Sequence, residues 1–156
     1  MLKKKLSIPI IELEDFSELD NDEKILAEKA INVAKNAYAP YSEFNVGAAV
    51  LLEDGDIITG SNQENAAYPS GLCAERVALF YAGAIKGKVA PKIMAIAALN
   101  GLSLTDDPVT PCGACRQVFA EIETRYSKSF SLLLIGKKKI IKIKKAEYLL
   151  PLAFKS

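Results

Sequence analysis

Only four residues, 136–139, separate two apolar runs near the end of the chain, and this short joint constrains the fold strongly. Residues 130–135 form the first run, and residues 140–144, where isoleucine and lysine largely alternate, form the second. Both are typical of β-strands. A parallel connection between neighbouring strands requires a crossover of about a dozen residues or more. If the two strands pair, we therefore expect them to run antiparallel.

Upstream of this joint, segments with helical spacing of apolar residues alternate with short apolar runs. Asp20 and Glu23 resemble a capping box at the start of the first helix, and Pro40 prevents that helix from continuing. Asp54-Gly55 between two apolar runs indicates a hairpin. The expected helices are 20–37, 73–86 and 113–126, and the expected earlier strands are 44–52, 57–60 and 93–99. This order predicts an α/β fold, a three-layer α/β/α sandwich on a five-stranded mixed sheet.

The length of 156 residues suits one domain, preceded by an extension over residues 1–20 that lacks sustained periodicity. The basic start is followed by a short apolar stretch interrupted by Pro9 and Glu12. We therefore expect neither a signal peptide nor a membrane span, and we expect a cytoplasmic location. The 20 basic residues nearly balance the 19 acidic ones. This balance gives no reason to expect nucleic acid or a membrane as partner.

The chain has three cysteines and no histidine. An odd number of cysteines cannot be fully paired within one chain, which argues against a secreted disulfide scaffold. The absence of histidine removes the usual general base, the Ser-His and Cys-His nucleophile systems, and the commonest zinc ligand. A site of the zinc type in this chain must therefore use thiolates and carboxylates.

All three cysteines lie where a loop is expected to pass into a helix. Cys73 precedes one helix, and Cys112 and Cys115 begin another. Free N–H groups and the helix dipole favour thiolates at such positions. Three protein ligands with an open fourth position are typical of a catalytic zinc site, whereas structural sites are closed by four. The alternatives are a redox Cys-x-x-Cys pair and a buried, inert cysteine. Glu75, two residues after Cys73, favours the metal site.

These residues resemble the signature of the cytidine deaminases, in the small homotetrameric form with three cysteine ligands. The resemblance covers roughly residues 22–154. The segments that carry it are Ala39-Pro40-Tyr41-Ser42-x-Phe44-x-Val46-Gly47-Ala48-Ala49, Gly60-x-Asn62-x-Glu64-Asn65-Ala66-Ala67-Tyr68, Cys73-Ala74-Glu75-Arg76 and Pro111-Cys112-Gly113-Ala114-Cys115-Arg116-Gln117.

The resemblance implies a catalytic domain over 21–156 that hydrolyses cytidine and 2′-deoxycytidine to uridine and 2′-deoxyuridine, with release of ammonia, in pyrimidine salvage. One Zn²⁺ per subunit would be held by the three cysteines and would lower the pKa of a bound water. Glu75 would transfer the protons. Arg76 would offset the negative charge of the thiolates, and Arg116 is a second candidate for that role.

For the substrate, the resemblance implies that Asn62 and Glu64 bind the ribose, that backbone of Ala74 holds the pyrimidine edge, and that Phe44 packs against the base. Phe154, in a tail that resembles Leu-Leu-Pro-x-Ala-Phe, would cap the base in a neighbouring subunit. The alternative is a tail that packs on its own domain. The sequence departs from the family at Leu152, where glycine is common, and in the long segment 101–109.

Three other functions stay open. Deaminases that act on nucleic acid generally use a histidine ligand and join the last two strands through a helix, which this sequence does not favour. Blasticidin-type deaminases share the zinc motifs, although Phe44, Asn62 and Glu64 favour a nucleoside. A structural zinc module without catalysis would have little need of Glu75. The lysine-rich segment 137–145 is better explained as a strand with one solvated face than as a nucleic-acid site.

Overall fold

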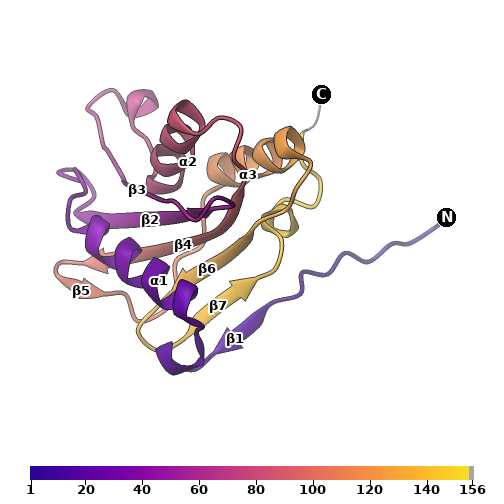
Figure 1. Cartoon of the computed structure of the whole chain (residues 1–156), viewed down its shortest axis with the longest axis horizontal. Coiled ribbons are helices and arrows are strands. Elements are labelled where there is room, and N and C mark those ends of the chain that lie inside the picture. The colour runs from indigo at the N-terminus through magenta and orange to yellow at the C-terminus, as the bar shows by residue number, and fades with distance from the viewer. Residues whose placement is uncertain (155–156) are drawn as a thin grey trace.

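The computed structural model describes residues 1–154 and contains one mixed β-sheet with three α-helices (Figure 1). The helices are α1 (Asn21–Ala34), α2 (Ala74–Ile85) and α3 (Gly113–Tyr126). The strands are β1 (Ile11–Leu13), β2 (Phe44–Leu52), β3 (Ile57–Ser61), β4 (Pro91–Asn100), β5 (Ser103–Leu104), β6 (Ser131–Ile135) and β7 (Ile140–Ile143). None of the helices within this range is long and apolar enough to cross a bilayer.

The sheet order is β1-β7-β6-β4-β2-β3, with β5 paired to β4. The β4–β6 pair is parallel, because α3 provides the crossover between them, and the other pairs are antiparallel. The predicted antiparallel pairing of the last two strands is confirmed: Leu134 lies opposite Ile141 across the short joint.

The prediction of five strands is wrong, since the sheet has seven. Residues Ile11–Leu13 of the expected extension pair with β7 and cover the edge of the sheet. Ser103 and Leu104 fold back on the end of β4 after a turn at Gly101, which has a positive φ. Both additions are too short to show a period of their own, and they depend on pairing with a strand already in place.

Local signals in the sequence account for the element boundaries. The Asp20 side chain accepts from the Glu23 backbone and the Glu23 side chain accepts from the Asp20 backbone, so the predicted capping box is present. α1 ends at Ala34, three residues before the predicted end, and tighter turn bonds continue to Ala37. The β2–β3 hairpin turns at Gly55, whose φ of 91° suits glycine.

Two hydrophobic clusters form the core. Alternating residues of β2 enter different clusters, because successive side chains of a strand point to opposite faces. Ala49 and Leu51 lie with residues of α1, whereas Ala48 and Val50 lie with residues of α2 and α3. The two clusters therefore place α1 on one face of the sheet and α2 and α3 on the other, and Figure 1 shows α2 and α3 close together. The cluster that contains Ala48 and Val50 therefore supports α2 and α3, the helices that begin directly after Cys73 and Cys112.

Candidate metal centre and active site

The three cysteine sulfurs meet where α2 and α3 begin. Cys73 is the residue that caps α2, and Cys112 caps α3, with Cys115 in the first turn of the same helix. Neither capping cysteine uses its side chain to cap its helix, which leaves the sulfur available to a metal. Cys115 is fully buried in the core and Cys112 is exposed. The three Sγ atoms all lie within 4.8 Å of one another.

The spacing of these sulfurs fits one zinc ion. Tetrahedral Zn–S bonds of about 2.3 Å separate neighbouring sulfurs by about 3.8 Å. The Sγ atom of Cys112 lies 3.6 Å from that of Cys73 and 3.5 Å from that of Cys115. Within residues 1–154, no histidine, aspartate or glutamate joins this group of possible ligands, so a fourth position remains for a small molecule.

The thiols influence each other's ionisation strongly. The neighbouring thiol of Cys115, together with hydrogen bonds to Arg76 and Cys112, lowers the pKa of Cys73 to about 5. The pKa of Cys115 is raised, first by the neighbouring Cys73 and then by burial. Three crowded thiols cannot all ionise without a compensating cation. A divalent metal supplies that cation.

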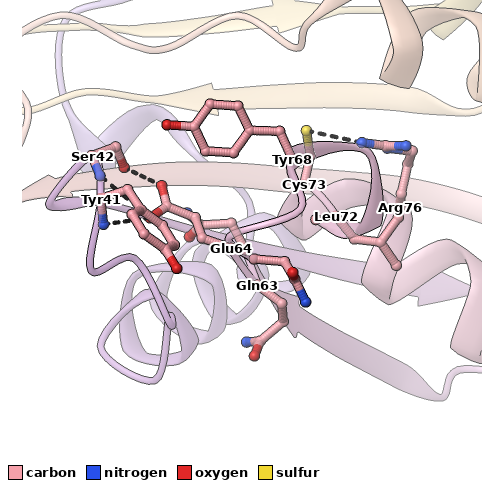
Figure 2. A pocket seen from close by; sticks show the side chains of 11 residues that line it. Tyr41, Ser42, Gln63, Glu64, Tyr68, Leu72, Cys73 and Arg76 are labelled. Atoms are coloured by element: carbon pink, nitrogen blue, oxygen red, sulfur yellow. Dashed lines mark hydrogen bonds between the residues drawn. The ribbon is translucent and has the colours of Figure 1, made fainter.

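Arg76 lies against the cluster of three cysteines. Its Nη2 atom donates to Cys73 Sγ at 3.6 Å, as Figure 2 shows. The thiolate of Cys73 in turn raises the pKa of Arg76. Among the described residues, the buried Nε atom of Arg76 has no hydrogen-bond partner. The guanidinium therefore faces the sulfurs, which is the position expected for a group that offsets thiolate charge.

Glu75 is 4% exposed and lies in the first turn of α2, between Ala74 and Arg76. Burial raises the pKa of its carboxyl group, and the neighbouring Cys73 thiolate adds to that rise. A carboxyl group with a raised pKa exchanges protons more readily near neutral pH than an exposed one. Ala74 is fully buried and begins α2, where backbone N–H groups lack partners within the helix.

A cavity of about 450 Å³ opens beside Cys73 and Arg76. Asn62 and Glu64 line it together with Tyr41, Ser42 and Tyr68, and Figure 2 shows Glu64 turned toward the 41–42 turn. Glu64 accepts hydrogen bonds from the Ser42 hydroxyl and from the Tyr41 and Ser42 backbone N–H groups. The Ser42 bond, followed by that from Tyr41, lowers the pKa of Glu64. Glu64 is therefore a fixed carboxylate at the cavity wall.

Asn62 connects the cavity to strand β2. Its side chain accepts from the Val46 N–H at 2.7 Å and donates to the Phe44 carbonyl at 2.9 Å. The amide therefore fixes the first residues of β2, and one lone pair and one N–H of the side chain remain for a ligand. Phe44 is half-buried and does not line the cavity.

Phe154 lies on the C-terminal tail and is not among the residues that line the cavity, and its side chain is 80% exposed. Gln117 of α3 holds its backbone: Gln117 Nε2 donates to the Phe154 carbonyl, and the Phe154 N–H donates to Gln117 Oε1. Arg116, expected as a second partner of the thiolates, instead donates to two carbonyl oxygens, those of Pro111 and Leu149.

Four of these residues have hydrogen-bond partners that no local sequence pattern indicates. Tyr41 and Ser42 hold a carboxylate more than twenty positions away in the sequence, and Gln117 holds the end of the tail. Arg116 joins the tail, at the Leu149 carbonyl, to the Pro111 carbonyl directly before Cys112. Each belongs to a segment that the sequence singled out, but the partners depend on the tertiary fold and leave no local pattern.

Residues 20–128 match the family model described as the cytidine and deoxycytidylate deaminase zinc-binding region. The chain is 48% identical to the cytidine deaminase of Halalkalibacterium halodurans over 101 aligned residues. These residues make up 65% of this chain and 72% of that protein. It is 39% identical to the cytidine deaminase of Mycobacterium tuberculosis over 102 aligned residues, which again make up 65% of this chain and 72% of that protein.

Solved structures agree with this relationship. The cytidine deaminase of Burkholderia pseudomallei superposes with a TM-score of 0.72 at 37% identity, over 87% of this chain and all of that one. The cytidine deaminase of Mycobacterium tuberculosis superposes with a TM-score of 0.66 at 33% identity, over 88% of this chain and all of that one. The fold is that of the cytidine deaminases, and the three-cysteine cluster fits their zinc site. This chain therefore belongs to the cytidine and deoxycytidylate deaminase zinc-binding family.

Proposed function

We propose that this protein is a cytidine deaminase, which hydrolyses cytidine and 2′-deoxycytidine to uridine and 2′-deoxyuridine with release of ammonia. The observation that carries the proposal is the cluster of three cysteine sulfurs with the buried Glu75 beside it in the first turn of α2. Three ligands leave one coordination position open, and a carboxyl group with a raised pKa is the proton carrier that hydrolysis at such a position requires.

Cys73, Cys112 and Cys115 hold the metal in this account. Zinc, when bound, supplies Lewis acidity that makes water a nucleophile near neutral pH. The net charge of one Zn²⁺ with three thiolates is −1, which opposes the formation of a hydroxide. Arg76, which donates to Cys73 Sγ, offsets this charge.

Glu75 moves two protons. Its carboxylate takes one from the attacking water and gives it to N3 of the pyrimidine while the oxygen bonds to C4. It then takes the second proton from that oxygen and gives it to the exocyclic amine. The C4–N bond breaks, ammonia leaves, and the C4 carbonyl of uridine remains. Burial of Glu75 supports this role, because it brings the pKa of the carboxyl group closer to the working pH.

The cavity supports recognition of a nucleoside. Glu64 is fixed as a carboxylate and can accept a hydrogen bond from a ribose hydroxyl, and Asn62 retains one donor and one acceptor for the same sugar. At the base, the backbone N–H of Ala74, which has no partner within α2, is the group that we assign to the pyrimidine edge. We assign the apolar contact with the base to Phe44 at the start of β2, although this residue does not line the cavity.

The proposal extends to assembly and location. We assign the catalytic domain to 21–156 and the extension to 1–20, and we place the protein in the cytoplasm, in pyrimidine salvage, as a homotetramer with one zinc per subunit. Three large apolar side chains of α2 support the assembly, since Phe80, Tyr81 and Ile85 are each about half exposed. Exposure of Phe154 supports its contact with a neighbouring subunit. Neither nucleic acid nor a membrane is a proposed partner.

The direct test is an absorbance assay with zinc-loaded protein and four compounds: cytidine, 2′-deoxycytidine, cytosine and blasticidin S. We expect the cytidine band to fall for both nucleosides, with stoichiometric ammonia, and little or no change for the other two. Turnover of blasticidin S alone would reassign the substrate. No turnover of any compound would reject the proposed enzyme and favour a structural zinc module.

A further inference from the structure

The three cysteines are supported unequally by the fold. Cys115 is fully buried within α3, and Cys73 is partly buried at the start of α2. Cys112 is exposed and precedes α3, at the end of the loop that follows β5. Core packing therefore fixes Cys112 less than the other two ligands, and its position depends on what holds the loop.

Arg116 holds that loop. Its Nε atom donates to the Pro111 carbonyl at 2.8 Å, and its backbone N–H donates to the Cys112 carbonyl at 3.0 Å. The Pro111 carbonyl belongs to the peptide group that also contains the Cys112 nitrogen. A bond to this carbonyl therefore restricts the rotation of the backbone that directs the Cys112 side chain.

The other end of the guanidinium reaches the C-terminal tail. Arg116 Nη1 lies 3.4 Å from the Leu149 carbonyl. α3 fixes this tail at two further points. The Glu123 carboxylate accepts from the Glu147 N–H at 3.0 Å, and Gln117 binds the Phe154 backbone through both of its amide atoms. Figure 1 shows the yellow tail returning beside the orange α3.

We propose that Arg116 is a positioning residue of the zinc site, which holds the Cys112 ligand through the Pro111 carbonyl and uses the C-terminal tail as its second anchor. A planar guanidinium suits this role because its fixed N–H groups can reach two carbonyl oxygens at once. Arg116 thus differs from Arg76, whose partner is a ligand sulfur itself. The inference rests on the proposed zinc-dependent function only through the identity of the metal.

The test measures zinc affinity by competition with a chromogenic chelator, using the full-length zinc-loaded protein. Residues that orient metal ligands contribute about 10- to 100-fold to metal affinity. We expect Arg116→Gln to weaken zinc binding within that range. Arg116→Lys keeps the charge but can bind only one of the two carbonyls at a time, so we expect a smaller loss, between wild type and Arg116→Gln.

Arg125→Gln is the matched control, because Arg125 lies on the same helix and donates to a single carbonyl, that of Gly87, far along α3 from the cysteines. We expect its zinc affinity to equal that of wild type. A purely charge-based role predicts instead that Arg116→Lys binds zinc as tightly as wild type, and this result would overturn the proposal. Wild-type affinity in Arg116→Gln would overturn it as well.

A second measurement separates positioning from general stability. Alkylation of the zinc-loaded protein followed by peptide mass spectrometry reports which cysteine becomes reactive. In Arg116→Lys we expect Cys112 to react first and faster than in wild type, with the melting temperature little changed. Equal reactivity of Cys112 in the two proteins contradicts the proposal. Neither readout uses cytidine, so a failure of the deaminase assignment leaves this inference standing, and the reverse also holds.

Discussion

At the scale of single residues, Glu75 is the residue that distinguishes a catalytic zinc site from a purely structural one. Its carboxyl group is buried beside the sulfurs without being one of the grouped metal ligands. We expect Glu75→Gln to retain one zinc per chain, because the amide is close to isosteric, and to lose about 100- to 10,000-fold in turnover, because it cannot carry a proton.

Zinc content by elemental analysis and turnover by absorbance check this expectation together. Glu121→Gln, the same change at an exposed position of α3, is the control and should keep wild-type turnover. Substantial turnover in Glu75→Gln would show that a different group carries the protons.

The cysteine ligands could be predicted from the sequence because their spacing and their positions at helix starts are local properties. The support around them could not. The orientation of the Glu64 carboxylate depends on hydrogen bonds from the 41–42 turn, and that of the Arg116 guanidinium depends on the Leu149 carbonyl of the tail. Such bonds join segments whose proximity only the complete fold creates. The sequence suggests Arg116 as a second candidate partner of the thiolates, whereas its observed hydrogen bonds go to the carbonyls of Pro111 and Leu149.

At the scale of the elements, β3 fixes the start of α2 through a close approach at Gly60. A Cβ atom at this position would lie 2.6 Å from the Ala78 nitrogen and 2.8 Å from the Ala74 oxygen, both backbone atoms that cannot move independently. The close contact therefore sets the distance of Cys73 and Glu75 from the sheet. The long, strongly patterned elements were predictable, whereas β1 and β5 depend on pairing with a neighbour and were not.

Gly60→Ala should lower the free energy of unfolding by about 1–3 kcal/mol or more, because overpacking forces the helix away from the strand. Zinc affinity should fall with it. Gly83→Ala within α2 is the control, since its Cβ would meet only Arg125 Nη1 at 3.6 Å. We expect that variant to be neutral or more stable by up to about 1 kcal/mol. Urea unfolding measures the free energy of unfolding of both variants. Equal stability of Gly60→Ala and Gly83→Ala would show that the backbone of α2 does not constrain position 60.

At the scale of the whole molecule, the exposed apolar side chains of α2 and the projecting Phe154 predict association of identical chains. One chain has a mass of 16.9 kDa. We expect light scattering to give about four times this mass, and Phe80→Glu to give a smaller species, because a buried charge destabilises an interface. The exposed Lys3→Glu is the control and should keep the wild-type mass. A monomeric wild-type protein at micromolar concentration would contradict the proposed tetramer.

The measurement that tests the central claim most directly is the rate of cytidine conversion as zinc is added back to metal-free protein. We predict that the rate is near zero without metal, rises in proportion to the zinc bound, and reaches its plateau at one zinc per chain, because one three-cysteine cluster serves each active site. Full conversion by the metal-free protein, or none at one zinc per chain, would contradict the account.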